Sequence, residues 1–199
     1  MDFNLTEERA MLRDMLQRFL GERYDHEARR KLIASGAPYD ADILTELAKL
    51  GILGAMFSED DGGFGGTGFD LLVVFEELGR AGTIEPVVGS AVLAGGLLSE
   101  LGNASQKALI GQVIGGVTVL ALAHGEPQSR YDLSHVHTTA QADGGQIVLN
   151  GTKTHVINGA QAETLVVSAR ENGAKDDEAG ISLFLVPLAF EGVTCIDHR

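Results

Sequence analysis

The hydrophobic pattern of this chain changes its period once, near Gly115 and Gly116. Before this point, apolar residues recur every three or four positions, as they do on one face of a helix. After it, the period becomes two and β-branched residues are frequent, which is typical of strands. We therefore predict a helical domain over residues 1–116 and a β-sheet domain over residues 117–199.

Six segments of the first half have the pattern of helices. They are a first helix after Thr6 and the residues 27–34, 43–50, 69–80, 91–101 and 106–113. Thr6 is the expected N-cap of the first helix, because its hydroxyl can accept from first-turn amides and two acidic residues follow it. In segment 69–80 the apolar stripe predicts an inward and an outward face. The inward set is Leu71, Leu72, Phe75 and Leu78, and the outward set is Glu76, Glu77 and Arg80.

The second half has six short runs with the pattern of strands. They cover residues 117–123, 138–142, 146–149, 152–157, 164–169 and 181–186. The pairs Gly144-Gly145 and Asn150-Gly151 lie between neighbouring runs and supply the positive φ angles that tight hairpin turns need. We expect an antiparallel meander with a longer polar hairpin loop over residues 171–180.

Composition excludes several classes of protein. The net charge of −13 and the pI near 4.7 argue against nucleic acid, whose binding needs clustered basic residues. A single cysteine, Cys195, excludes an internal disulfide. The start of the chain lacks the basic stretch of a signal peptide, and no apolar run has the length of a membrane span. We expect a soluble protein of the cytoplasm that acts without a membrane.

Several residues that could carry chemistry have simpler interpretations. The glycine-rich run over residues 61–68 follows no predicted strand and lacks a Lys-Ser/Thr ending, so we interpret it as a structural loop. The acidic pairs Asp60-Asp61 and Glu76-Glu77 are adjacent in sequence, which favours solvation over a shared substrate. His124, His135 and His137 have no matching acidic or cysteine partners in the sequence, so no metal site is predicted.

Five longer motifs in order point to one family. They are LTEERAMLRD from Leu5, LAKLGILGAMFSEDDGGFGG from Leu47, VVFEELGRAG from Val73, VLNGTKTHVINGAQAETLVVSAR from Val148 and ISLFLVP from Ile181. In this order and spacing the chain resembles the acyl-CoA dehydrogenase family over nearly its whole length. Within the family, the segments MDFNLTEE, GERYDHEARR and QSRYDL are similar to the small subunit of pimeloyl-CoA dehydrogenases.

The resemblance implies an α+β fold, an activity and a set of partners. The all-α N-terminal domain would be followed by an antiparallel β-barrel middle domain that is incomplete at its C-terminal end. The family's enzymes oxidise an acyl-CoA between its α and β carbons with FAD, as a base removes the α proton. The protein positions the thioester and tunes the flavin. An electron-transfer flavoprotein would take the electrons.

The family's first flavin segment matches residues 125–132. The usual Thr-Glu-Pro appears here as Gly125-Glu126-Pro127, and the usual Ser-Asp appears as Tyr131-Asp132. Gly125 has no hydroxyl to offer the flavin, and Tyr131 replaces a serine that would contact phosphate. We therefore expect the backbone amides of residues 124–126, beginning at His124, to contribute more, and Arg130 to add a compensating charge.

The second flavin segment, usually Lys-x-Trp-Ile-Thr-Asn-Gly, matches residues 153–159. His155 stands where the family has the indole that shields the flavin, and Ile157 stands where it has a hydrogen-bonding threonine. His155 could stack in the indole's place, although a structural role is the simpler interpretation. The resemblance thus gives His124, Gly125, Tyr131, His155 and Ile157 as cofactor contacts.

The family's usual catalytic base is a glutamate in a C-terminal helical bundle, and no residue here matches it. Three hypotheses follow. The chain is a piece of an FAD-dependent acyl-CoA dehydrogenase that does not turn over alone, a flavin-poor partner subunit of a two-chain enzyme, or an acyl-CoA binding module without redox function. Because missing strands leave an open sheet edge, we also expect homo- or hetero-oligomers or aggregation.

Overall fold

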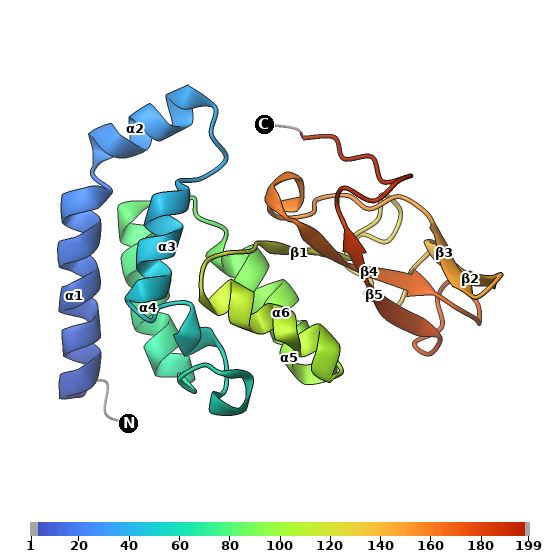
Figure 1. The fold of residues 1–199 in the computed structure, drawn as a ribbon, viewed down its shortest axis with the longest axis horizontal. Coiled ribbons are helices and arrows are strands. Elements are labelled where there is room, and N and C mark those ends of the chain that lie inside the picture. The colour runs from blue at the N-terminus through green and yellow to red at the C-terminus, as the bar shows by residue number, and fades with distance from the viewer. Residues whose placement is uncertain (1–3, 198–199) are drawn as a thin grey trace. The chain divides into compact units, whose positions relative to one another are not determined.

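The computed structural model describes residues 4–197 and divides into two compact units (Figure 1). The helical unit contains the residues up to Val87 together with Gly96–Val117. The sheet unit contains Val88–Gly95 together with the residues from Thr118 onward. The predicted succession of a helical half and a sheet half is confirmed, although a short segment before residue 96 joins the sheet unit. None of the helices in the described part is long and apolar enough to cross a membrane.

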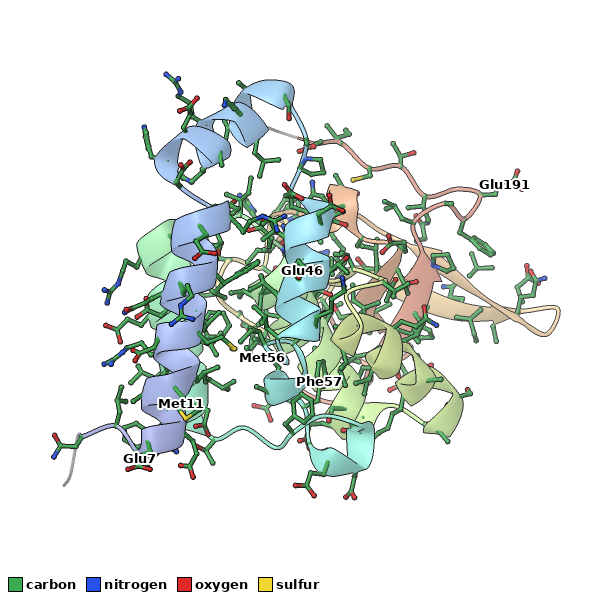
Figure 2. All side chains as sticks on the ribbon, turned by 60° about the vertical axis from the view of Figure 1, so that its left-hand side comes forward. Glu7, Met11, Glu46, Met56, Phe57 and Glu191 are labelled. Carbon is green, nitrogen blue, oxygen red and sulfur yellow. The ribbon has the colours of Figure 1, made fainter. Side chains whose placement is uncertain are left out.

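Six α-helices form the helical unit. They are α1 (Glu7–Arg23), α2 (His26–Ser35), α3 (Ala41–Lys49), α4 (Gly68–Ala81), α5 (Gly96–Leu101) and α6 (Ala104–Ile114). Thr6 is the N-cap of α1, as predicted, and its side chain accepts from the Arg9 amide. Leu16, Leu47 and Ile110 are fully enclosed in the core, whereas Met11, labelled in Figure 2, is 72% exposed on α1.

Helices α1 and α4 pack side by side through both apolar and polar contacts. Arg9 Nε donates to Asp70 Oδ1 at 2.8 Å, and its guanidinium lies 5.3 Å from the centre of the Phe69 ring. Farther along, Gln17 donates to the Glu77 carboxylate at 3.0 Å. Glu77 is therefore only 2% exposed, and the prediction that it faces outward was wrong. Leu72, predicted inward, is 58% exposed.

The glycine-rich run is a loop, as predicted. Its backbone folds onto the turn after α3, with the Phe64 amide donating to the Gly54 carbonyl at 2.9 Å. The Asp61 carboxylate accepts from Ser99 on α5 and from Lys107 on α6. These two hydrogen bonds, with Ser99 the larger cause, lower the pKa of Asp61. The loop therefore fastens three parts of the helical unit to one another.

The predicted helix over residues 91–101 is two structures. Val87–Gly95 is a π-helix whose residues from Val88 onward belong to the sheet unit, and α5 follows it in the helical unit. Small residues fill this π-helix, and Ala91 and Ala94 are buried. π-Helical turns are rare and are frequent at functional sites. The apolar pattern alone could not distinguish this wider turn from an α-helix.

The sheet unit contains five strands, β1 (Leu120–Ala123), β2 (Thr139–Asp143), β3 (Gln146–Asn150), β4 (Thr164–Arg170) and β5 (Ile181–Pro187). Their order is β1-β4-β2-β3, and β5 also pairs with β4. The hairpins β2–β3 and β4–β5 are antiparallel, as predicted. However, β1 lies parallel to β4, so the sheet is mixed and open and is not an antiparallel meander.

The run at residues 152–157 was predicted as a strand and forms none. Two left-handed backbone positions, His155 with a φ of 54° and Asn158 with a φ of 58°, interrupt the extended conformation. A non-glycine residue with positive φ is uncommon and marks a turn or a functional constraint. The segment therefore crosses the unit as an irregular stretch.

A buried arginine organises the hairpin loop over residues 171–180. Arg170, at the end of β4, is 7% exposed and donates to backbone carbonyls and to no carboxylate in the described part of the chain. Its acceptors are Ser134 at 2.7 Å, Val136 at 3.2 Å, Asn172 at 3.4 Å, Lys175 at 3.1 Å, Asp177 at 2.9 Å and Ala179 at 2.9 Å. One guanidinium thus holds both the loop and the segment before β2.

Candidate functional site

The two segments predicted to bind a flavin lie side by side in the sheet unit. The Thr154 amide donates to the Gly125 carbonyl at 2.8 Å. A Cβ atom at Gly125 would lie 3.0 Å from the Thr154 carbonyl oxygen, so the close approach of the two backbones favours glycine.

We call the place where residues 124–126 meet residues 153–154 the junction, and the Glu126 carboxylate is the hydrogen-bond acceptor at its centre. Its side chain is 1% exposed and accepts from the Thr138 amide at 2.9 Å, from Thr138 Oγ1 at 2.6 Å and from Lys153 Nζ at 2.8 Å. The His137 amide donates to its other oxygen at 2.8 Å. Burial raises the pKa of Glu126, but the hydrogen bonds from Lys153 and Thr138 outweigh it and lower the pKa to about 2. The carboxylate is therefore ionised and joins three segments.

Lys153 completes the junction with three hydrogen bonds. Its Nζ donates to Glu126 Oε1 at 2.8 Å, to Ser168 Oγ on β4 at 2.9 Å and to the His124 carbonyl at 3.1 Å. Burial lowers the pKa of Lys153, and the neighbouring carboxylate of Glu126 opposes this shift. The ammonium group thus connects both flavin segments to the central strand of the sheet.

His124 lies directly after β1, and its ring is half-buried. Its Nδ1 is 2.9 Å from Ser168 Oγ. Burial, followed by the positive charge of Lys153, lowers the pKa of His124, although Glu126 opposes the shift. The side chain is therefore neutral at physiological pH.

The remaining predicted contacts lie on the surface of the sheet unit. Tyr131 is 99% exposed and Ile157 is 54% exposed, and His155 is also exposed. Arg130 has a φ of 49°, so it occupies a left-handed position where the family has a glycine-rich turn. The junction brings His124 and Gly125 next to the stretch that contains His155. No contact in the described residues joins Tyr131 to this group.

The π-helix packs directly against the second segment. A Cβ atom at Gly89 would lie 2.7 Å from Asn158 Oδ1 and 3.1 Å from the Ile157 carbonyl oxygen, so this close approach favours glycine. The next residue, Ser90, accepts a hydrogen bond from the Leu120 amide on β1 at 2.9 Å. The second flavin segment and strand β1, which leads into the first segment, are therefore fixed against the same short helix.

One expectation for the first segment is wrong. The Glu126 amide was expected to be available to a cofactor, but it donates to Ser129 Oγ at 3.0 Å. Ser129 in turn donates to the Glu126 carbonyl at 3.1 Å, which closes a local turn. A serine two residues after a proline is a common local cap of this kind, and that spacing was a usable signal.

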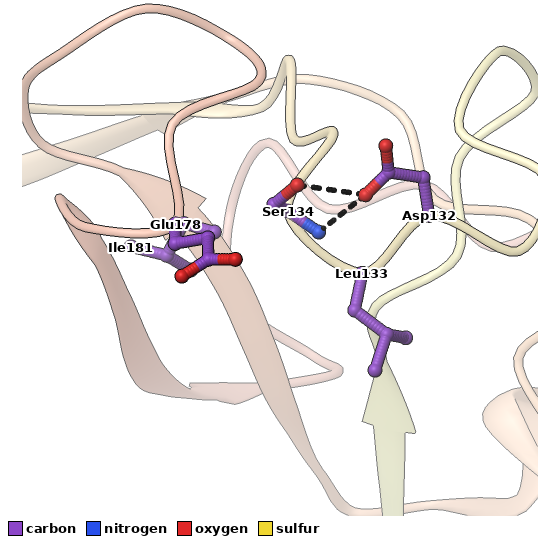
Figure 3. A pocket seen from close by; sticks show the side chains of 5 residues that line it. All are labelled: Asp132, Leu133, Ser134, Glu178 and Ile181. Atoms are coloured by element: carbon purple, nitrogen blue, oxygen red, sulfur yellow. Dashed lines mark hydrogen bonds between the residues drawn. The ribbon is translucent and has the colours of Figure 1, made fainter.

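A pocket of about 350 Å³ lies near this segment in the sheet unit (Figure 3). It is lined by Asp132, Leu133, Ser134, Glu178 and Ile181. Asp132 accepts from the side chain of Ser134 at 2.7 Å and from its amide at 2.9 Å, as the dashed lines show, and these bonds lower the pKa of Asp132. Two carboxylates make this pocket a poor site for a phosphate group.

Sequence reasoning missed the acidic partner of His135. The ring of His135 contacts the carboxylate of Asp176 from the loop over residues 171–180, and its Nε2 lies 2.9 Å from His137 Nε2. Among residues 4–197, no group of three or more His, Cys, Asp or Glu side chains is arranged to hold a metal ion. The partners Thr138, Lys153 and Ser168 of the junction were also missed, because side-chain pairing across 12 or more positions leaves no local pattern.

The chain matches two known domains in order. The acyl-CoA dehydrogenase N-terminal domain matches residues 6–113, and the acyl-CoA dehydrogenase middle domain matches residues 121–199. The short-chain specific acyl-CoA dehydrogenase of Clostridium acetobutylicum is 29% identical, with 96% of this chain and 51% of that protein covered. The chain spans about half, or less, of the length of the curated relatives it matches.

Solved structures give the same result. Butyryl-CoA dehydrogenase from Megasphaera elsdenii superimposes with a TM-score of 0.80 and 27% identity, over 96% of this chain and 51% of that chain. The ChsE4-ChsE5 complex from Mycobacterium tuberculosis superimposes with a TM-score of 0.81 and 26% identity, over 98% of this chain and 50% of that chain. Both domain matches and their order coincide with the helical and sheet halves described above, and the chain belongs to the acyl-CoA dehydrogenase family.

Proposed function

We propose that this chain is the flavin-facing part of an FAD-dependent acyl-CoA dehydrogenase and that a complementary polypeptide segment completes its active site. The observation that carries the proposal is the junction at which Gly125 and Thr154 meet above the Glu126–Lys153 ion pair. Two segments with the family's flavin motifs are held together there by buried charges. FAD, when bound, would supply the hydride acceptor for α,β-oxidation of an acyl-CoA.

The residues of the junction fit an aromatic ring system. Ile157 offers an exposed apolar side chain, and His155 lies two positions before it on the same irregular stretch. His124 and the backbone at Gly125 offer polar groups beside this stretch. An apolar surface with a few converging polar groups is the usual composition of a cofactor site. His124, Gly125, His155 and Ile157 would hold the ring, and Tyr131 would lie toward its phosphate side.

Turnover tests the proposal directly. The chain alone, given FAD, butyryl-CoA and an artificial electron acceptor, should bind FAD and show no steady oxidation of substrate. Addition of a chain that contains the family's C-terminal helical bundle should restore turnover and allow electrons to pass to an electron-transfer flavoprotein. Steady turnover by the isolated chain would show that a base was overlooked among its own residues.

A second candidate function is a flavin-poor partner subunit of a two-chain enzyme. The replacement of a phosphate-binding serine by Tyr131 favours it, because this side chain is 99% exposed and has no contact with the junction in the described residues. The ChsE4-ChsE5 relative is itself a complex of two chains. A colourless chain that acquires flavin only with its partner would support this function, whereas stoichiometric flavin that survives gel filtration of the chain would exclude it. The closer resemblance to pimeloyl-CoA dehydrogenase small subunits stays a prediction.

A further inference from the structure

We propose that the junction fixes His124 as the neutral tautomer with its proton on Nε2, and that this N–H donates to a carbonyl oxygen of the flavin. The donor role rests on the proposed function. The tautomer rests only on contacts within the sheet unit. His124 would then supply, from its ring, the hydrogen bond that Gly125 cannot supply where the family has a threonine.

The ammonium group of Lys153 uses all of its protons within the junction. An ammonium group has three N–H donors, and Lys153 has three acceptors within hydrogen-bond distance, the His124 carbonyl, Glu126 Oε1 and Ser168 Oγ. Each acceptor therefore receives one proton. Ser168 Oγ accepts from Lys153 and still has its own proton to donate.

The buried hydroxyl of Ser168 then decides the tautomer. Ser168 is fully enclosed, and Nδ1 of His124 is the remaining partner of its Oγ among the described residues. If Nδ1 carried a proton, the hydroxyl proton would have no acceptor, and a buried unpaired donor costs about 1–3 kcal/mol. If Nδ1 is unprotonated, the hydroxyl donates to it and every group is satisfied. The ring proton therefore lies on Nε2.

The charges around the ring also oppose a doubly protonated imidazolium. Lys153 faces His124 from the irregular stretch, and Glu126 faces it from the segment after β1. Glu126 is already paired with Lys153 at 2.8 Å, so its charge is largely compensated. Ser168 of β4 is uncharged. Burial together with Lys153 keeps the ring neutral.

Nε2 is the end of the side chain that remains available. Among residues 4–197, Nε2 of His124 has no acceptor within hydrogen-bond distance, and the ring is only half-buried. A neutral N–H adjacent to Gly125 is chemically matched to a carbonyl oxygen, and it keeps its proton over the physiological pH range. The carbonyl oxygen of an acyl-CoA thioester could accept the same hydrogen bond, so binding of FAD and of acyl-CoA must be measured separately.

The tautomer can be measured without any flavin. Long-range ¹H–¹⁵N spectra of the chain at pH 7 should show Nδ1 of His124 as the unprotonated nitrogen and Nε2 as the protonated one. Ser168→Ala should abolish this preference and mix the two tautomers. A proton on Nδ1 in the wild-type chain would overturn the proposal without reference to flavin binding.

The donor role is tested by ligand titration. His124→Phe should weaken FAD binding about three- to tenfold, the effect of one lost hydrogen bond, whereas His124→Gln retains a side-chain N–H and should bind within about threefold of wild type. A parallel titration with butyryl-CoA identifies the acceptor. Weaker binding of butyryl-CoA with unchanged FAD binding would assign the donor to the thioester and refute the flavin assignment. Failure of the wild-type chain to bind FAD would refute the donor role and the flavin-binding part of the proposed function, while the spectra still decide the tautomer.

Discussion

The helical unit and the sheet unit each contain a buried glutamate, Glu85 and Glu126, and the surroundings of the two carboxylates differ. Glu126 of the sheet unit is ion-paired with Lys153 and is stabilised as an anion. Glu85 of the helical unit is 7% exposed, accepts from the Asp40 amide at a long 3.4 Å and has Oε2 without a partner in the described residues. Burial raises the pKa of Glu85. The two carboxylates should therefore respond differently to substitution, because removal of one partner of a buried ion pair leaves an uncompensated charge.

The largest expected effect is loss of the ion pair in the sheet unit. Glu126→Gln leaves the Lys153 ammonium buried without its counter-charge and should reduce the free energy of unfolding by about 3–5 kcal/mol. Urea denaturation followed by circular dichroism measures it. Glu76→Gln is the matched control, because it removes a carboxylate from the exposed pair with Arg80 and should change the same quantity by less than about 0.5 kcal/mol. Equal effects of the two substitutions would contradict the central position of Glu126.

Lowering the pH should destabilise the chain by protonating the same carboxylate, Glu126. The pKa of Glu126 is about 2, against an ordinary 4.5, so its contribution is complete above pH 4.5 and is lost as the pH falls toward 2. The difference corresponds to about 3 kcal/mol. Unfolding measured between pH 5 and pH 2 should be steep in the wild type and flatter in Glu126→Gln. Parallel curves for the two proteins would show that other carboxylates govern acid unfolding.

In the helical unit, a glutamate-to-glutamine substitution at Glu85 should increase the free energy of unfolding, whereas the one at Glu126 should decrease it. Because the pKa of Glu85 is raised, its charged form weakens the fold increasingly as the pH rises above the ordinary value of 4.5. Glu85→Gln should therefore stabilise the chain at pH 7, by on the order of 1 kcal/mol. The gain should disappear at pH 4, where Glu85 is protonated. A loss of stability at pH 7 would mean that an unseen partner neutralises this carboxylate.

A smaller effect is expected from exposed apolar side chains on the sheet unit, which should promote self-association of the chain. On strand β3, Ile147 and Val148 are both about half exposed, at 51% and 48%, so the hairpin leaves apolar groups on both of its faces. Replacing both with lysine should shift size-exclusion profiles from oligomer toward monomer while leaving the unfolding free energy within about 0.5 kcal/mol. Gln141→Lys with Gln146→Lys adds equal charge to the same hairpin as a control. A wild-type monomer at high concentration would refute the expected association.

The parts predicted well from the sequence are those that depend on local chemistry. Thr6 caps α1, the glycine-rich run forms a loop, and the turn at Gly144-Gly145 joins β2 to β3 with φ angles of 55° and 86°. Caps, glycine turns and apolar periodicity act over a few residues, so the sequence displays them directly.

The parts predicted poorly depend on contacts between distant residues. Glu77 is buried because Gln17, 60 positions earlier, donates to it. The pairing of β1 with β4 is parallel because the chain between them crosses the unit, and hairpin signals do not reveal such crossovers. The same limit applies to the candidate site. Resemblance gave its residues, but the position of Lys153 between Glu126 and Ser168 is visible only in the fold.

The guanidinium of Arg170 has a consequence for how this protein can vary. It holds the loop over residues 171–180 through main-chain carbonyls, which every amino acid supplies. The identities of exposed Lys175, Glu178 and Ala179 are therefore free to drift during evolution, provided that the arginine remains. The same tolerance makes an exposed side chain of this loop, such as Lys175, a suitable place for a fluorescent label, because the label leaves the main-chain carbonyls in position.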